Sequence, residues 1–228
     1  MSHPDLVTTE TGEGVCRITM DDGAVNAFSV EMLEAVLSAL DEAEQANAIV
    51  VIRGREGKFS AGFDLKTLGT KTNEMLGLGA KLAERLFSFP RPTVAVCTGH
   101  GIAMGGFVLM SCDIRVGVEG DFRIGLNEAA IGLTMPRFAV ALAGHRLNPA
   151  WHDRSVITGE LFGPADAKTA GFLDHVVPAD QLDAVAEQAI EAMKNLNEDA
   201  HRETKLRARA SALEGIRAGL EPADDGTW

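Results

Sequence analysis

Two short turns rich in small residues are the parts of this sequence best suited to chemistry. Residues 59–65 read Phe-Ser-Ala-Gly-Phe-Asp-Leu, and residues 99–106 read Gly-His-Gly-Ile-Ala-Met-Gly-Gly. Each turn follows an apolar, strand-like run, at residues 48–52 and 93–97. Small residues leave backbone N–H groups open, and two such groups aimed at one point form an oxyanion hole, which stabilises negative charge on a carbonyl oxygen. For either turn alone, tight packing of a strand against a helix is the simpler explanation.

The composition argues against several classes of partner. The chain has 228 residues, of which 46% are hydrophobic, enough for one domain with a sizeable core. Its formal net charge of −12 disfavours nucleic acid, because neutralising phosphates requires clustered lysine and arginine. No apolar run reaches the ~18–20 residues that cross a bilayer. The N-terminus lacks the basic and apolar segments of a signal peptide, so we expect a cytoplasmic location and no membrane contact.

The cysteine and histidine patterns disfavour disulfide and metal chemistry. Cys16, Cys97 and Cys112 form no CxxC pair and stand among apolar neighbours, which favours reduced thiols in the core. The six histidines show neither an HExxH motif nor paired-ligand spacing. We therefore expect no metal site.

Two other enzyme classes fit the sequence poorly. The glycines at 99, 101 and 105 depart from the G-x-G-x-x-G spacing of a dinucleotide-binding turn and lie in mid-chain. The sequence contains no tyrosine, which excludes a tyrosine-dependent hydride-transfer site. Ser60 does not form a G-x-S-x-G nucleophile elbow, because Lys58 stands where the first glycine is needed.

Alternating strands and helices are predicted around the two turns. Apolar alternation or continuous apolar runs predict strands at residues 15–20, 48–52, 93–97 and 114–118. Helices are predicted at residues 29–45, with Ser29 as the N-cap, and at 74–87 and 105–111. This alternation predicts an α/β fold with parallel strands.

After Pro136 the pattern becomes mostly helical. Gly163 and Pro164 mark the start of a helix that ends before Gly171. A short strand at residues 173–177 and amphipathic helices at 180–194 and 198–219 are predicted to follow. Residues 221–228 have no periodicity and are expected to fray.

A third stretch completes a pattern that resembles a known family. Residues 124–128 read Ile-Gly-Leu-Asn-Glu and run into Ile-Gly-Leu at 131–133. With the two turns in this order, the chain resembles the crotonase superfamily of enoyl-CoA hydratases and isomerases over about residues 12–205. The resemblance implies a crotonase-like core of repeated ββα turns at residues 1–178. A helical C-terminal region at 179–228 would follow, shorter than in typical members.

The resemblance also implies roles for single residues. The backbone N–H groups of Ala61 and Met104 would form the oxyanion hole, and Glu128 would be the catalytic base. Most members have glycine at the Met104 position, so this donor requires a negative φ there. An apolar pocket would raise the pKa of the Glu128 carboxyl and suit it to proton transfer near neutral pH. Without the resemblance, a surface residue at a helix start explains Glu128 better.

Phe107 is the clearest departure from the family's hydratases, which carry a second glutamate there. A phenylalanine can neither accept a proton nor position water, whereas one carboxylate can move a proton from C2 to C4 of a 3-enoyl thioester. The stretch at 124–128 also resembles the pattern of the mitochondrial Δ3,Δ2-enoyl-CoA isomerases, which have an apolar residue at the Phe107 position. We therefore expect Δ3-to-Δ2 isomerisation of an unsaturated acyl-CoA in fatty-acid metabolism. The alternatives are a hydratase of weak or atypical activity and an inactive acyl-CoA-binding protein.

Further residues are expected to line the substrate. They come from the two turns and from the loop at residues 22–27, which also reads as a plain strand-to-helix connection; for Asp64 we favour a role in organising its turn. The candidate substrate- and CoA-binding residues are Ala24, Asn26, Ala27, Ser60, Ala61, Phe63, Asp64, Leu65, Met104, Gly105 and Phe107. CoA would be part of the substrate, so no separate cofactor is expected. The resemblance implies a homotrimer or a dimer of trimers.

Overall fold

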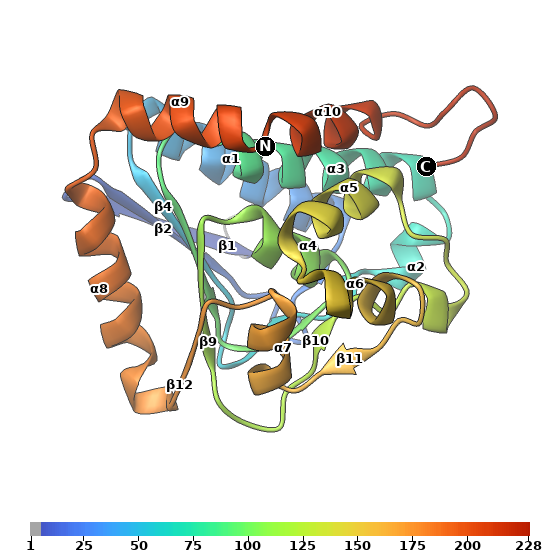
Figure 1. Ribbon diagram of the computed structural model, residues 1–228, viewed down its shortest axis with the longest axis horizontal. Coiled ribbons are helices and arrows are strands. Elements are labelled where there is room, and N and C mark those ends of the chain that lie inside the picture. Colours follow the sequence, from blue (N-terminus) through green and yellow to red (C-terminus); the bar gives the residue numbers. More distant parts are fainter. Residues whose placement is uncertain (1–5) are drawn as a thin grey trace.

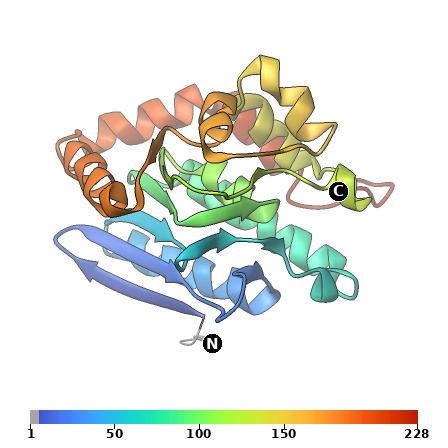
Figure 2. The same ribbon diagram turned by 90° about the horizontal axis from the view of Figure 1, so that it is seen from below.

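Three β-sheets form the framework of the protein, whose computed structural model describes residues 6–228 (Figures 1 and 2). The large sheet has the order β1-β2-β4-β7-β9-β12. Its strands are Val7–Gly12, Val15–Met20, Ile49–Arg53, Thr93–Cys97, Ile114–Val118 and His175–Val177. The second sheet has the order β11-β10-β8-β5. Its strands are Leu161–Phe162, Ile124–Gly125, Gly99–Ile102 and Gly57–Ser60. The third sheet pairs β3 (Ala27–Phe28) with β6 (Gly62–Phe63).

Along the chain, a strand of the large sheet is repeatedly followed by a strand of the second sheet and then by a helix. The helices are α1 (Val30–Gln45), α2 (Leu65–Leu68), α3 (Thr72–Ser88), α4 (Met104–Ser111), α5 (Arg137–Arg146), α6 (Pro149–Val156), α7 (Pro164–Ala170), α8 (Leu182–Lys194), α9 (Glu198–Ala208) and α10 (Ala210–Ala218). Two 3₁₀ turns, η1 (Ala129–Ile131) and η2 (Ala179–Gln181), interrupt the connections. Apart from the β1–β2 hairpin, the large sheet is parallel. The predicted α/β fold of repeated ββα turns is confirmed.

Helix α1 illustrates how the sequence determines these elements. Its N-cap Ser29 accepts a hydrogen bond from Met32 N–H at 3.2 Å, which satisfies one of the unpaired amides of the first turn. Its apolar stripe, which includes Leu33, Val36 and Leu40, is buried in the main core. The strands β4 and β7 are buried on both faces, as their continuous apolar runs predicted.

The C-terminal helices pack on the core from two sides. Helix α8 covers one face of the large sheet, where Leu182, Ala186 and Ile190 are buried (Figure 1). Helix α10 packs against α3 and α5. Strand β12 pairs with β9 at the edge of the large sheet. The boundary at residue 178 stays a prediction.

Several expected element bounds need correction. The helix expected at 198–219 is two helices that meet at Arg209, where the backbone leaves the helical conformation and the side chain contacts the Asp113 carboxylate. The strand expected at 173–177 covers only His175–Val177. Residues 221–228 form no helix or strand, but the end of the chain is held in place, since Trp228 Nε1 donates to Asn73 Oδ1 at 2.9 Å.

Within residues 6–228, no helix combines the length and apolar character required to span a membrane.

Candidate active site

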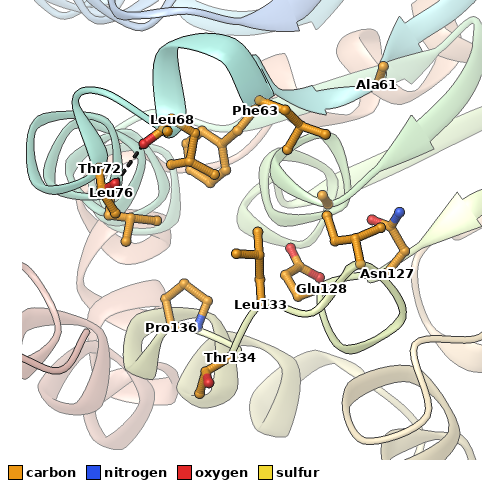
Figure 3. Close-up of a pocket in the computed structure, with 14 residues that line it drawn as sticks. Ala61, Phe63, Leu68, Thr72, Leu76, Asn127, Glu128, Leu133, Thr134 and Pro136 are labelled. Atoms are coloured by element: carbon orange, nitrogen blue, oxygen red, sulfur yellow. Dashed lines mark hydrogen bonds between the residues drawn. The ribbon is translucent and has the colours of Figure 1, made fainter.

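A cavity of about 340 Å³ lies where α2, α3, β6 and the segment after β10 meet (Figure 3). Its lining is largely apolar, and Glu128 is the one ionisable residue among the lining residues that the structure describes. The lining residues are Ala61, Phe63, Leu65, Leu68, Gly69, Thr72, Leu76, Ala103, Asn127, Glu128, Ile131, Leu133, Thr134 and Pro136. A largely apolar pocket with few polar groups is the usual form of a small-molecule site.

Glu128 stands immediately before η1 and points into this cavity (Figure 3). The residue is only 4% exposed, and neither carboxylate oxygen has a hydrogen-bond partner. Burial disfavours the charged form and raises the pKa of the Glu128 carboxyl to about 7. A carboxylate with this pKa and no competing partner is suited to accept and return a proton near neutral pH.

The first predicted oxyanion donor needs correction. The Ala61 N–H donates to Val25 O at 3.0 Å, so it is already engaged. The neighbouring Phe63 N–H is better directed, because the ladder between β3 and β6 uses the Asp64 N–H, which donates to Phe28 O at 3.0 Å. In a parallel pairing, the amide of the residue between points to the opposite edge of the strand. Phe63 therefore replaces Ala61 as the candidate donor.

The second predicted donor, Met104, is the first residue of α4. The amide of a first helical residue has no partner within its own helix, and the helix dipole adds partial positive charge there. Met104 adopts the helical, negative φ that the sequence argument required, and the positive φ of 51° falls on Ala103 before it. Ala103 N–H donates to Gly125 O at 2.9 Å, which ties this turn to the strand before Glu128.

The two turns approach each other at Gly62. A Cβ on Gly62 would lie 2.8 Å from Ala103 Cβ and 3.5 Å from Met104 N. Gly62 also has a φ of +95°, which strains any residue with a side chain. The absence of a side chain at this position therefore lets the edge of β6 lie beside the start of α4.

Several predicted substrate-binding residues line no part of the cavity. Asn26 and Ser60 are fully buried and hydrogen-bonded to the backbone around them. Asp64 caps α2, since its carboxylate accepts from Lys66 N–H and Thr67 N–H. This fits the organising role that the sequence favoured for it.

The remaining predicted contacts lie in the loop at residues 22–27 and in α4. The amides of Ala24 and Ala27 donate to the Asp22 carboxylate, at 2.7 Å and 2.9 Å. Gly105 lies in the first turn of α4, where a Cβ would lie 3.0 Å from Ser60 Cβ. These residues shape the backbone around the turns.

Phe107 was expected in the pocket but lies in the core. Its side chain is fully buried and packs edge-on against Phe138, with ring centroids 5.4 Å apart. It is absent from the cavity lining, whereas Phe63 and Leu65 are part of that lining. Phe107 therefore contributes apolar packing behind the wall of the cavity.

Sequence reasoning missed most of the apolar wall and the polar lining residues Thr72, Asn127 and Thr134. Asn127 lines the cavity beside Glu128 (Figure 3), and Leu68, Leu76 and Pro136 line other parts of it. The sequence could have indicated Asn127, because the residue is part of the stretch at 124–128 that identified Glu128. The contribution of Leu68 and Leu76 follows only from how α2 and α3 pack. In the part of the chain from residue 6 onward, no group of three or more His, Cys, Asp or Glu side chains is arranged to hold a metal ion.

A family model described as enoyl-CoA hydratase/isomerase matches residues 10–215. The chain belongs to this family. It is 28% identical to the human mitochondrial enoyl-CoA delta isomerase 1 over 212 residues, covering 90% of this chain and 70% of that protein. It is 31% identical to a putative enoyl-CoA hydratase of Thermus thermophilus over 200 residues, covering 83% and 78%.

Among solved structures of the enoyl-CoA hydratase/isomerase family, an apo enoyl-CoA isomerase of Mycobacterium tuberculosis superposes with a TM-score of 0.91. The two sequences are 39% identical, and the alignment covers 95% of this chain and 96% of the other. These similarities confirm the crotonase fold that the motifs implied. Relatives named isomerase and relatives named hydratase lie at comparable identity, so the family alone does not decide between the two reactions.

Proposed function

We propose that this member of the enoyl-CoA hydratase/isomerase family moves the double bond of a 3-enoyl-CoA to the 2-position. One observation carries the proposal: Glu128 is the sole ionisable residue among the described residues lining an apolar cavity, and its carboxylate has no other partner. A double-bond shift needs one group that takes a proton from C2 and gives it back at C4. Hydration needs in addition a group that holds and activates a water molecule.

The proposed reaction proceeds through an enolate. The Glu128 carboxylate takes a proton from C2, and the electrons of the broken C–H bond form a C1=C2 enolate with negative charge on the thioester oxygen. The N–H groups of Phe63 and Met104 would hold this oxygen, and one such donor is typically worth about 10²–10³ in rate. The protonated Glu128 then returns the proton to C4. A C2=C3 double bond remains, and no atom is gained or lost.

Three features support this course. The pKa of Glu128, raised by burial to about 7, makes the same group an effective base and an effective acid near neutral pH. The approach of β6 to the start of α4 at Gly62 brings together the two turns whose Phe63 and Met104 amides are the candidate donors. The leucines of the wall keep water away from the enolate and match an aliphatic acyl chain.

One observation favours hydration as the second candidate. The amide of Asn127 lines the cavity beside Glu128 and offers a polar group that could hold a water molecule (Figure 3). In this alternative, Glu128 activates that water for addition to a 2-enoyl-CoA. The Asn127→Ala variant would then lose hydration and keep isomerisation.

The test offers the protein a 3-enoyl-CoA and, separately, a 2-enoyl-CoA, with products followed by chromatography and mass. We expect the first to give the unhydrated 2-enoyl isomer and the second to gain little water. A mass gain of one water from the 2-enoyl-CoA as the main activity would overturn the proposal in favour of hydration. The Glu128→Gln variant should abolish turnover and keep acyl-CoA binding; binding without turnover by the unaltered protein would instead indicate an acyl-CoA-binding protein. The homotrimer or dimer of trimers implied by the resemblance is part of the proposal and is tested by mass measurement in solution.

A further inference from the structure

A buried hydroxyl connects the turn that carries the Phe63 amide to the loop before α1. Ser60 Oγ donates to Asn26 O at 2.6 Å and accepts from Gly62 N–H at 3.0 Å. The Ser60 side chain is fully buried. Removing this hydroxyl would leave a buried carbonyl and a buried amide without their partners, and neither could turn to water.

The Asn26 side chain fixes the other end of this connection. Its Nδ2 donates to Met20 O at 2.8 Å and also lies 3.3 Å from both Lys58 O and Phe59 O. Its Oδ1 accepts from Asp22 N–H at 2.9 Å. Asn26 is 1% exposed and has a φ of +53°, a left-handed conformation that asparagine adopts more readily than most residues. The Asn26 carbonyl that receives the Ser60 hydroxyl is therefore held rigidly.

Asp22 holds the loop itself in shape. Its carboxylate accepts hydrogen bonds from the amides of Ala24, Asn26 and Ala27 at 2.7–2.9 Å. Burial opposes ionisation of Asp22, but these amides and Arg55 together keep the pKa of its carboxyl below the usual value. The loop thus presents a fixed row of backbone carbonyls to the turn.

Among the amides of residues 61–64, two donate directly to this row and a third reaches it through the Ser60 hydroxyl. Ala61 N–H and Asp64 N–H donate to the carbonyls of Val25 and Phe28, and Gly62 N–H donates to the Ser60 hydroxyl. By the alternation of a parallel ladder, the Phe63 N–H lies on the opposite edge of β6, and this strand approaches the start of α4 at Gly62. The direction of the Phe63 amide is therefore set by the bonds of its neighbours.

Gly62 is the weak point of this arrangement. Glycine has more backbone freedom than any other residue, and it directly precedes the peptide that presents the Phe63 N–H. The Ser60 hydroxyl is the group that holds the Gly62 amide. Without it, the Ala61–Gly62 peptide loses its hydrogen bond, and the adjoining Gly62–Phe63 peptide is held in its orientation only by the pairing of β6 with β3.

We propose that Ser60 is a positioning residue: through Asn26 O and Gly62 N–H, its hydroxyl aims the Phe63 amide at the thioester oxygen of the substrate. The inference rests on the proposed function, because it presumes that the Phe63 amide receives that oxygen. It adds a residue that touches no substrate and sits behind the wall of the cavity.

Three variants test the role of Ser60. Ser60→Ala removes the hydroxyl, and Ser60→Cys replaces it with a thiol, a weaker donor and acceptor. The matched control is Ser155→Ala in α6, because Ser155 is equally buried and its Oγ makes one hydrogen bond, to Trp151 O at 2.8 Å. Each folded variant is assayed for kcat and KM with a 3-enoyl-CoA. A second readout is the infrared C=O band of bound hexanoyl-CoA carrying ¹³C at the thioester carbon, a saturated probe that is not isomerised.

We expect kcat to fall about 10- to 100-fold in Ser60→Ala, a fraction of the 10²–10³ typical of losing a whole donor, with KM within about twofold. Ser60→Cys should lie between Ser60→Ala and the unaltered protein. The carbonyl band should shift to low wavenumber on binding, and the shift should shrink in the same order. Ser155→Ala should retain kcat and the full band shift.

Two results would overturn the inference. One is a Ser60→Ala variant with unaltered kcat and an unaltered band shift. The other is an equal loss in Ser155→Ala, which would indicate a general loss of packing. Failure of the proposed function is distinguishable: an unaltered protein that shifts the band but does not isomerise disproves the reaction, while the order of band shifts still tests Ser60. An unaltered protein that produces no band shift overturns both.

Discussion

Glu128 carries a cost in stability that follows from its place in the cavity. A carboxylate without hydrogen-bond partners in an apolar wall is destabilised relative to one in water, which is why its pKa rises to about 7. In the unfolded chain the same group ionises with an ordinary carboxyl pKa. The folded protein therefore binds a proton more tightly than the unfolded chain does, and this difference makes both activity and stability depend on pH.

The first prediction concerns the rate. The base form of Glu128 must be present to take the C2 proton, so kcat/KM for a 3-enoyl-CoA should fall about tenfold per unit as the pH drops below about 7. A pH–rate profile of the isomerisation between pH 5 and 9 measures this. A profile that is flat down to pH 5 would show that Glu128 in the free enzyme does not have the raised pKa.

The second prediction concerns the free energy of unfolding. Its dependence on pH has the opposite sign from that given by an ordinary paired carboxylate. Because the folded-state pKa is raised, the cost of the buried charge is fully present above pH 7 and absent below about pH 4.5. Glu128→Gln should therefore raise the free energy of unfolding at pH 8 by on the order of 1–3 kcal/mol. The gain should shrink as the pH falls toward 4.5. Urea unfolding of both proteins at pH 8 and pH 5 measures it, and equal differences at the two pH values would refute the charge argument.

At the scale of elements, the contact between β6 and the start of α4 is the feature on which the site depends. Gly62 is the residue that permits it, both by its φ of +95° and by its lack of a Cβ. The two effects can be separated, because Gly14 in the β1–β2 turn has a φ of +75° but has open space where a Cβ would be.

The third prediction compares these two glycines. Gly62→Ala forces its Cβ to within 2.8 Å of Ala103 Cβ, so the strand must move away from Met104. We expect kcat to fall by about 10²-fold, the typical effect of misplacing one oxyanion donor. Gly14→Ala carries a similar backbone strain far from the site and should leave kcat within about twofold. Equal effects of the two substitutions would show that backbone strain, and not the close approach, limits activity.

The sequence indicates these elements well and their contacts less well. Strands such as β7 and β9 were predicted to the residue, because an apolar run flanked by turns has a local cause. The break at Arg209 was not predicted, and the carboxylate that its side chain contacts lies almost a hundred positions earlier in the chain, beyond the reach of a local pattern. The same limit explains why Ala61 was chosen as a donor. Residues 59–65 indicate a candidate oxyanion turn, but which of its amides is free depends on pairing with β3, which no local pattern encodes.

For the whole molecule, α4 links the site to the C-terminal helices. Its first residue, Met104, supplies a candidate donor, and the carbonyls at its other end accept from the Arg146 guanidinium. Asp113, which follows this helix, lies 2.7 Å from Lys205 Nζ and 2.8 Å from an Arg209 guanidinium nitrogen. All three side chains of this ion pair network are at most 10% exposed. The C-terminal helices are thus anchored to the end of the helix that begins at the site.

The fourth prediction removes this anchor. Asp113→Asn leaves Lys205 and Arg209 buried without a compensating charge, and breaking a buried pair in this way typically costs about 3–5 kcal/mol. For a chain of this size, 3 kcal/mol corresponds to a fall in Tm of about 6–12 °C. The matched control is Glu203→Gln, which removes the exposed i,i+4 pair with Arg207 and should cost less than about 1 kcal/mol.

The pH dependence of this loss separates it from a simple packing defect. Burial alone would raise the pKa of Asp113, but Lys205 and Arg209 hold it below the ordinary carboxyl value. The stability that Asp113 contributes is therefore present above that ordinary value and is lost as the pH falls through the lowered pKa. The difference in unfolding free energy between the unaltered protein and Asp113→Asn should be full at pH 7 and should shrink as the solution is acidified toward the lowered pKa. A difference that stays constant on acidification would mean that the carboxylate anchors the C-terminal helices by shape and hydrogen bonding, and not by its charge.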